Sequence, residues 1–442
     1  MGHDPTPRTP VSRRSILQGL LGAGGLLAAG GTLAGCSTSA AGRGGVQLWD
    51  LFSGADGAKM RSMIQSVTTA APDLSVRPVT LAWGSPYYTK LAMSSASGKA
   101  PETAIMHVSR LAGYAPGGLL EPFDLDLLAE QGITEQDFAP AVWQSCQYEG
   151  RLYALPLDTH PFIAFYNRDI ADEAGLLTAD GTLQPITSPD AMIDTATRLA
   201  AVTGAQGISF GHVLDTGQSW RLFWGLYAQT GGDYSMTVGS PASIDRDKAR
   251  EVIEFLVRLM DGTAMADNLN YPGAISAFTS GRTGMILSGE WELPAFAESI
   301  PNLGAMPMPT LFGTPATYAD SHAWVLPRQA DQDPETRRRT YELVAGILKQ
   351  GGTWAAAGHI PAYLPVQDTP EYTQLSPQTE YASAGENPVF DPSVWFAGAG
   401  TEFQKQVSEA LSGAFTGALS PDEAIDSMLS RIDAMLLAPN PT

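Results

Sequence analysis

Cysteine and basic residues are both scarce in this chain. Cys36 and Cys146 are the only cysteines among 442 residues, so no framework of disulfide bonds holds the fold together. Lys and Arg number 26 against 46 Asp and Glu, which gives a formal net charge of −20 at pH 7. Such a surface repels the phosphate backbone, and we expect no nucleic-acid partner. The hydrophobic share of 44% is that of a folded globular chain, which we expect to be monomeric.

Motifs of common metal and cofactor chemistry are also missing. The sequence contains no His-Glu-x-x-His, no Cys-x-x-Cys, no phosphate loop and no G-x-G-x-x-G fingerprint. Metal hydrolysis, nucleotide hydrolysis and hydride transfer therefore lack their usual parts. We expect no cofactor, no metal and no enzymatic activity.

One pattern resembles the nucleophile elbow of esterases. Residues 207–211 fit G-x-S-x-G around Ser209, and Asp320, His322 and His359 follow in an order that would complete a triad. An elbow needs a helix directly after its serine, whereas a glycine-rich stretch follows here. We therefore expect Ser209 to have no catalytic role.

A second enzyme-like pattern is the pair Glu290 and Glu292, which resembles the two carboxylates of a glycosidase. Residues two apart point in opposite directions along a strand and have no fixed separation in a loop. We expect one to face a ligand and one to be solvated. A secreted ester or glycoside hydrolase using Ser209 or Glu290 and Glu292 remains the alternative from another functional class.

The first 45 residues are typical of an export signal and an anchor. Arg13 and Arg14 precede a glycine-rich apolar stretch, as in twin-arginine signals, and its six glycines between residues 16 and 34 disfavour a membrane-spanning helix. Leu33-Ala34-Gly35-Cys36 then matches a lipobox. We predict a signal peptide over 1–35, lipidation at Cys36 and a tether over 36–45. The protein would be exported and held at the outer face of the cell membrane by lipid only.

Strands and helices alternate in the body of the chain. Residues 46–52, 74–83 and 103–108 have the composition of strands, and residues 58–70 and 87–97 that of helices. Further helices are predicted over 188–202, 220–229, 246–260, 334–349 and 421–437. This order favours two α/β lobes with mostly parallel sheets. Ligands of such sheets bind outside the carboxyl ends of the strands, where Phe52, Ser53, Trp83, His107, Ser109 and Arg110 stand.

Several aromatic residues lie at or near Gly, Pro or Ser breaks, where burial in a core is least expected. The examples are Trp83, Trp220, Trp224, Trp291, Trp324 and Tyr363. Indole faces stack on the C–H patches of a pyranose ring, while its hydroxyls bind carboxylate, guanidinium and amide groups. The pattern favours a sugar site, although core packing is the alternative for any single tryptophan.

Three stretches resemble the carbohydrate-uptake class of extracellular solute-binding proteins, which includes maltose-binding protein. Gly150-Arg151-Leu152-Tyr153-Ala154-Leu155-Pro156, followed by residues 165–169 and 174–176, is the first. Phe278 and residues 281–285, followed by Gly289-Glu290-Trp291, form the second, and residues 358–365 form the third.

The resemblance implies a periplasmic-binding-protein-like fold, in which two α/β lobes joined by a hinge close on a ligand in the cleft between them. It divides the body into a first lobe over 46–159 and 319–368 and a second over 160–318 and 369–442. Hinge segments are expected near 158–161, near 317–323 and after about Val366.

The resemblance and the residue pattern together select the candidate site. We expect ligand contacts from Ser53, Trp83, Ser109, Arg110, Asp158, His160, Trp220, Trp224, Glu290, Trp291, His322 and Tyr363. His160 stands where maltose-type members carry a carboxylate, and Ser109 where they carry an acidic residue. Trp291 matches the stacking aromatic of the family.

The predicted function is that of an extracellular receptor lipoprotein. It would bind a mono- or oligosaccharide and deliver it to the permease subunits of an ABC importer. A glycerophosphodiester or a polyol is the alternative ligand, but a phosphate group calls for clustered basic residues, and the cleft candidates offer mainly Arg110 and Arg221.

Overall fold

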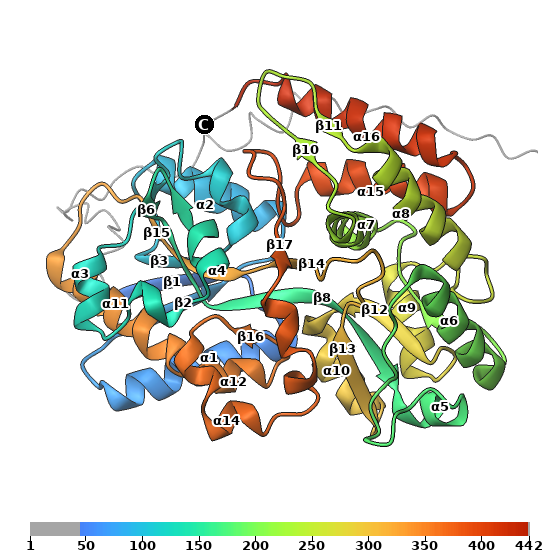
Figure 1. The fold of residues 1–442 in the computed structure, drawn as a ribbon. Coiled ribbons are helices and arrows are strands. Elements are labelled where there is room, and N and C mark those ends of the chain that lie inside the picture. The colour runs from blue at the N-terminus through green and yellow to red at the C-terminus, as the bar shows by residue number, and fades with distance from the viewer. Residues whose placement is uncertain (1–44, 441–442) are drawn as a thin grey trace, which may run out of the picture. The chain divides into compact units, whose positions relative to one another are not determined.

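The computed structural model describes residues 45–440 of the chain. The predicted signal peptide, the predicted lipidation site Cys36 and all but the last residue of the predicted tether lie outside the described residues. Two large β-sheets organise the described part, with helices packed around each of them (Figure 1). None of its helices is both long and apolar enough to cross a membrane.

The first sheet has the strand order β2-β1-β3-β15-β4, with β7 pairing β15. Its strands are β1 (Val46–Asp50), β2 (Val76–Thr80), β3 (Thr103–His107), β4 (Leu120–Glu121), β7 (Ala154–Pro156) and β15 (His322–Pro327). β1 pairs in parallel with β2 and β3, as expected, whereas β15 is antiparallel to β3, β4 and β7. The carboxyl ends of β1, β2 and β3 therefore meet at one edge.

The second sheet is mixed and follows the order β17-β14-β8-β12-β9, with β13 and β16 also pairing β8. Its strands are β8 (Asp158–Asn167), β9 (Ile208–Ser209), β12 (Met285–Gly289), β13 (Leu303–Pro307), β14 (Thr317–Asp320), β16 (Ile360–Pro361) and β17 (Pro388–Val389). The expected parallel arrangement fails here because β8 is antiparallel to β12, β13, β14 and β16.

Two neighbouring connections carry the chain between the sheets. β7 in the first sheet leads within two residues to β8 in the second, and β14 leads back to β15 across Ser321 alone. β14 and β8 pair at this point, with Asp320 opposite His160. The two connections run side by side below the label β14 in Figure 1. The lobe boundaries given above stay predictions. β16, which falls in the predicted first lobe, pairs with a strand of the second sheet.

Alternation along β8 explains how the second sheet is packed on both faces. Phe162, Ala164 and Tyr166 belong to one apolar core, and Ile163 and Phe165 belong to another. Successive side chains of a strand point to opposite faces, so a strand buried on both sides reads as a continuous apolar run. A separate apolar core packs around the first sheet.

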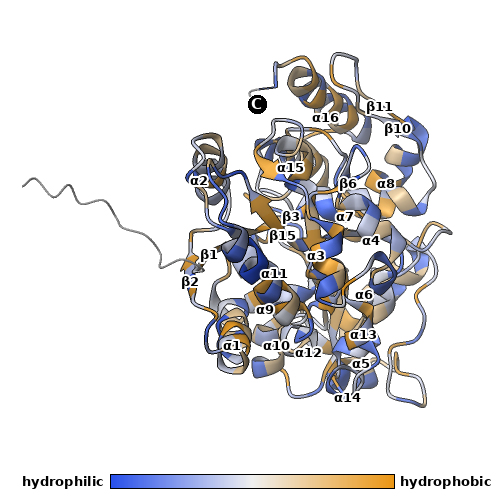
Figure 2. Ribbon diagram, turned by 90° about the vertical axis from the view of Figure 1, so that its left-hand side faces the viewer, coloured by the Kyte–Doolittle hydropathy of each residue, from blue (hydrophilic) through white to orange (hydrophobic). Residues whose placement is uncertain are grey.

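Helices surround the first sheet at its faces and ends. They are α1 (Gly54–Ala70), α2 (Ser85–Ala96), α3 (Leu125–Glu130), α4 (Pro140–Ser145), α11 (Pro334–Leu348), α12 (Gly351–Ala355), α13 (Leu364–Gln367) and α14 (Pro370–Thr373), with the short 3₁₀ helices η1 (Val108–Gly113) and η2 (Glu135–Asp137). The hydrophilic first half of α11 is visible in Figure 2. Its three consecutive arginines pair with nearby acids such as Glu121 and Asp73 at the surface.

The helices around the second sheet confirm the predictions over 188–202, 220–229, 246–260 and 421–437. They are α5 (Arg168–Glu173), α6 (Pro189–Thr203), α7 (Gln218–Gln229), α8 (Arg246–Leu259), α9 (Tyr271–Thr279), α10 (Leu293–Ser299), α15 (Glu402–Phe415) and α16 (Pro421–Leu436), with η3 (Glu290–Glu292), η4 (Gln378–Glu380) and η5 (Ala382–Gly385). Two small hairpins, β5 (Gln147–Tyr148) with β6 (Arg151–Leu152) and β10 (Tyr234–Ser235) with β11 (Ser243–Ile244), complete the description.

Cys146, the one cysteine among the described residues, is fully buried. Burial raises the pKa of its thiol far above the usual value, so the reactive thiolate is disfavoured. Cys146 is therefore a packing residue and not a nucleophile.

Candidate ligand-binding site

A cavity of about 570 Å³ opens at the carboxyl ends of β1, β2 and β3 and is closed on the other side by η3, α10 and the start of α7. Its size falls within the range of small-molecule sites, roughly 300–1,000 Å³. The lining residues are Leu51, Phe52, Ser53, Gly54, Ala55, Asp56, Trp83, His107, His160, Asp215, Thr216, Gly217, Gln218, Arg221, Tyr271, Trp291, Glu292, Pro294, Ala295, Tyr318, Asp320, His322 and Ala399.

Two tryptophans lie on opposite sides of the cavity. Trp83 follows β2 and is 47% exposed, so nearly half of its surface is available for contact. Trp291 lies on η3, where its Nε1 donates to the hydroxyl of Tyr271 at 3.0 Å. Its ring packs over Gly289, since a Cβ added there would stand 2.0 Å from the indole. The glycine of the Gly289-Glu290-Trp291 turn is thus required for the position of the tryptophan.

Charged groups border the tryptophans. The guanidinium carbon of Arg221 lies 5.3 Å from the ring centre of Trp291 and 5.8 Å from that of Tyr318. Glu292 accepts a hydrogen bond from Tyr271 at 2.7 Å, and burial raises its pKa. Asp215 caps the start of α7 by accepting the backbone N–H groups of residues 217 and 218, both at 2.7 Å. The cavity therefore presents a cation and carboxylates beside indole faces.

Asp158 lies fully buried behind the cavity and organises its floor. Its carboxylate accepts the Nδ1 hydrogens of His160 at 3.0 Å and His322 at 2.8 Å, the backbone N–H of His322 at 2.8 Å and the indole N–H of Trp354 at 2.7 Å. Burial works against ionisation, but the charge and hydrogen bonds of His322 and His160 outweigh it and hold the pKa of Asp158 well below its usual range.

His107 and His160 are neutral near pH 7. Burial, followed by the nearby His322, lowers the pKa of His160 to about 3, and burial likewise holds the pKa of His107 well below its usual value. Nδ1 of His107 shares a hydrogen bond of 2.6 Å with the hydroxyl of Tyr88. Each ring is thus fixed through Nδ1.

Asp320 is the second buried carboxylate at the floor. It accepts hydrogen bonds from the backbone N–H of Ser109 at 3.1 Å, from the Ser109 hydroxyl and from the backbone N–H of Ser321 at 2.8 Å. Burial raises its pKa to about 7. Ser109 and Asp320 are 211 positions apart in the sequence, and the Asp320–Ser321–His322 connection brings them together.

His359 forms a third cluster beside the cavity. Its Nδ1 lies 2.8 Å from Glu290 Oε1 and 3.5 Å from Asp158 Oδ2, and its Nε2 lies 3.2 Å from Asp56 Oδ1. The angles at these contacts are not those of hydrogen bonds, so they are ionic contacts. Burial opposes the charge of His359, but Asp56 and Asp158 outweigh it and raise its pKa. Burial raises the pKa of Glu290 to about 8.

A glycine allows this cluster to form. Gly358 has a φ of +116°, and a Cβ at this position would lie 2.4 Å from the carbonyl oxygen of Glu290. Only glycine permits both that backbone conformation and that approach. It sets His359 directly against the η3 turn.

Five of the predicted ligand contacts line the cavity: Ser53, Trp83, His160, Trp291 and His322. Asp158, Ser109 and Glu290 do not line the cavity: Asp158 contacts His160, Ser109 contacts Asp320 and Glu290 contacts His359. The sequence predicts that these three side chains contact the ligand directly. In the structure each is buried against other residues of the chain and supports the side chains nearer the cavity.

Four other predicted contacts lie away from the cavity. Trp220 and Trp224 are 0% and 1% exposed in the core and stack on each other at 4.6 Å, because the inner face of α7 packs on β14 and α15. Tyr363 is buried in the first core against Phe138. Arg110 covers the ring of Tyr88 at 4.3 Å and donates to the carbonyl of Ala399.

The cavity also contains polar residues that the sequence reasoning did not select. Asp56, Asp215, Thr216 and Tyr271 belong to this group. Asp56 follows the strand-ending turn after β1, so the rule about carboxyl ends of strands could have found it. Asp215 lies in the loop between Gly211 and Gly217, which matches no family motif and follows no long strand.

Ser209 has no access to the cavity. It is fully buried in β9, and its hydroxyl accepts a hydrogen bond from Thr283 at 3.1 Å. No helix begins after it until α7 at Gln218. His322 lines the cavity, whereas Ser209 does not, so the geometry of an elbow and triad is absent here.

Curated relatives with sequence similarity are sugar-transport proteins. The maltooligosaccharide ABC transporter solute-binding lipoprotein of Streptococcus pneumoniae serotype 4 is 23% identical over 319 residues, which cover 68% of this chain and 70% of the relative. The maltodextrin-binding protein MdxE of Bacillus subtilis is 23% identical over 281 residues, covering 62% of this chain and 63% of the relative.

Solved structures share the fold. The GacH receptor of Streptomyces glaucescens, solved unliganded and with acarbose, has a TM-score of 0.72 at 19% identity, covering 89% of this chain and 98% of the receptor. The sugar-binding protein MalE of Xanthomonas citri has a TM-score of 0.72 at 16% identity, covering 89% and 97%. The expected periplasmic-binding-protein-like α/β fold is confirmed.

The model of one protein family matches residues 62–378, which contain most strands of both sheets and the floor residues from His107 to His359. The chain therefore belongs to the bacterial extracellular solute-binding proteins.

Proposed function

We propose that this protein is the sugar receptor of an ABC importer and that it binds a mono- or oligosaccharide in the cavity between the two sheets. The observation that carries the proposal is the pair of cavity tryptophans, Trp83 and Trp291, beside hydrogen-bonding charged groups. The relatives named for maltooligosaccharide and maltodextrin binding support the same class of ligand.

The chemistry of the lining matches that of a sugar ring. The C–H faces of a pyranose stack on indoles, and each hydroxyl both donates and accepts hydrogen bonds. Arg221 donates, Asp215 and Glu292 accept, and all three line the cavity near Trp291 or the start of α7. A phosphodiester would instead meet more carboxylates than guanidinium groups, which disfavours it.

The test is a calorimetric titration of the purified full-length chain with maltose, maltotriose, glycerophosphocholine and a polyol. We expect saturable binding of a sugar and no release of product by chromatography over the same period. Binding of glycerophosphocholine in place of every sugar would contradict the proposed ligand class. Product release that is lost in Ser209→Ala or Glu292→Gln would favour the hydrolase alternative.

The proposed location rests on the lipobox around Cys36. Cys36→Ala removes the only predicted acylation site, so we expect a precursor or a soluble protein that no longer partitions with membranes. Cys146→Ala is the matched control and should remain membrane-bound, because Cys146 is buried in the fold. Equal membrane retention of Cys36→Ala and the wild type would contradict lipidation at Cys36.

A further inference from the structure

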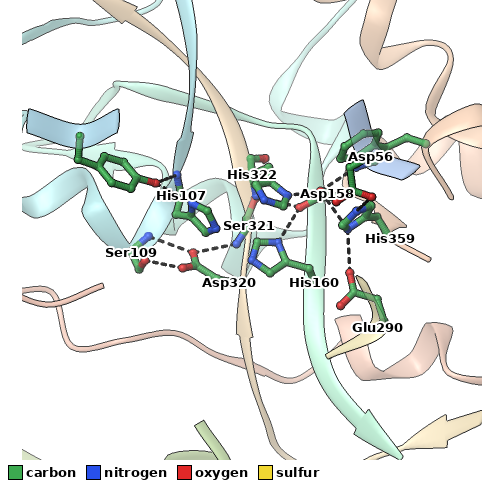
Figure 3. A network of polar contacts seen from close by, with 12 residues as sticks. Asp56, His107, Ser109, Asp158, His160, Glu290, Asp320, Ser321, His322 and His359 are labelled. Atoms are coloured by element: carbon green, nitrogen blue, oxygen red, sulfur yellow. Dashed lines mark hydrogen bonds and ion pairs between the residues drawn. The ribbon is translucent and has the colours of Figure 1, made fainter. Parts of the chain in front are cut away.

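Four of the six histidines of the chain gather at the cavity floor: His107, His160, His322 and His359. All four are nearly or fully buried, and each comes from a different segment of the sequence. Figure 3 shows His107, His160 and His322 close together, with Asp320 beside them and its carboxylate directed to Ser109 and Ser321. A sugar site alone does not call for so many imidazoles in one place.

Two sets of side chains at this floor have the spacing of metal ligands. The first consists of Asp158, His160, His322 and His359, whose polar atoms are already hydrogen-bonded or ion-paired with one another. Both oxygens of Asp158 accept N–H hydrogens, and the Nδ1 atoms of His160 and His322 carry those hydrogens. A protonated nitrogen cannot bind a metal, so this set is a hydrogen-bonded support.

The second set consists of His107, His160 and Asp320, whose ligand atoms all lie within 4.8 Å of one another. Nδ1 of His160 is held by Asp158 and Nδ1 of His107 by Tyr88, which leaves the Nε2 atom of each ring for a ligand. Among residues 45–440, no hydrogen bond reaches either Nε2. An imidazole whose Nδ1 is held by a carboxylate or hydroxyl is the usual arrangement of a metal-binding histidine.

The surroundings favour a cation at this place. All three side chains line the cavity, whose wall carries the carboxylates of Asp56, Asp215, Glu292 and Asp320 against the single guanidinium of Arg221. The ring of His322 packs against His160 at 4.3 Å and His107 at 4.7 Å and closes one side of the space. Two imidazoles and one carboxylate are a donor set that suits Zn²⁺.

We propose that His107, His160 and Asp320 bind a divalent transition-metal ion of the zinc type at the floor of the ligand cavity. The metal is held by Nε2 of both histidines and by one oxygen of Asp320. Nδ1 of His107 then donates to the oxygen of Tyr88. Because three protein ligands leave a tetrahedral ion one open position, that position faces the cavity and its occupant.

The test uses the full-length chain without a histidine tag, stripped with a chelator and dialysed. Titration with ZnCl₂ in a calorimeter, with metal content measured by mass spectrometry, is expected to give one ion per chain with a Kd of roughly 10 µM or tighter. The melting temperature of the wild type should rise with zinc, because the ion binds the folded chain.

Variants identify the ligands. His107→Gln, His160→Gln and Asp320→Asn should each weaken zinc binding by about 100-fold or more and abolish the zinc-dependent rise in melting temperature. His212→Gln is the matched control in the second core, where its ring contacts the carbonyl of Asp267, and should leave zinc binding unchanged. His359→Gln separates the two sets and should change the zinc affinity by less than about 10-fold.

The outcomes decide between the alternatives. No saturable zinc binding by the wild type would overturn the proposal, as would His107→Gln and His160→Gln variants that bind zinc as tightly as the wild type. Loss of binding in His359→Gln alone would assign the ion to the Asp158 set instead. Absorption of the Co²⁺-loaded wild type, with and without competing zinc, reports the site even if a variant fails to fold. The sugar titrations are made on metal-free protein, so failure of either proposal is distinguishable from failure of the other.

Discussion

The interior of the second sheet region and the wall of the cavity contain the same residue types in different environments. Trp220 is fully buried and donates its indole N–H to Asp391 at 2.6 Å, whereas Trp291 is half-buried beside the open cavity. Glu290 is fully buried against His359, while Glu292, two residues later, lines the cavity. Residue type and a nearby turn do not separate structural from ligand-facing side chains, because burial depends on what packs against the turn.

The largest expected effect is on the core side of this comparison. Trp220→Ala removes a stacked, hydrogen-bonded indole from α7, and we expect it to lower the free energy of unfolding by about 3–5 kcal/mol. Chemical denaturation monitored by circular dichroism measures this. Trp83→Ala is the matched exposed control and should change stability by less than about 0.5 kcal/mol. Equal losses of stability in Trp220→Ala and Trp83→Ala would contradict the assignment of Trp220 to the core and Trp83 to the exposed wall of the cavity.

Glu290 should make stability depend on pH. The pKa of Glu290 in the folded chain, about 8, lies above its value in the unfolded chain. The contribution of the protonated side chain to the free energy of unfolding is therefore complete below the unfolded pKa and is lost as the pH rises toward 8. Relative to Glu290→Gln, the wild type should lose about 3 kcal/mol between pH 5 and pH 8. Denaturation series at both pH values measure the difference. A constant difference would show that Glu290 does not hold a proton when buried.

Trp291→Ala tests the cavity side of the comparison. If its ring forms a stacking surface for the ligand, the loss in affinity is on the order of 2 kcal/mol, roughly thirty-fold, with little change in the ligand-free melting temperature. Sugar titrations and thermal melts of both proteins measure this. A variant with unchanged affinity, or one that melts far earlier without ligand, would place Trp291 with Trp220 among the packing residues.

The smallest effect is expected from Glu292→Gln. Glu292 offers one acceptor at the cavity, and replacing it should lower sugar affinity by about 1 kcal/mol while changing the free energy of unfolding by less than about 0.5 kcal/mol. Titration and denaturation of the same preparation measure both. A large stability loss in Glu292→Gln would mean that its bond to Tyr271 supports the fold more than the ligand.

Local patterns predicted many elements but not all of them. The helix α16 agrees with the prediction over 421–437, and Ser420 and Glu423 form a capping box at its start, with Pro421 in the first turn. The helix α15 was missed, although Thr401 caps it and apolar residues recur at helical spacing. The mixed second sheet was also missed, since the direction of β8 follows from the connection between the sheets and not from its own residues.

The sequence by itself determined the family, the alternation of strands and helices, and the candidates Ser53, Trp83, His160, Trp291 and His322, because strand ends and family motifs are local signals. Only the tertiary structure decided that Trp220 and Trp224 are buried and that Glu290 meets His359. It also decided that His107, His160 and Asp320, which share no motif, come within 4.8 Å. Such neighbours arise where β3, β8 and β14 meet, and the pairing of distant strands is not encoded in the spacing of residues along the chain.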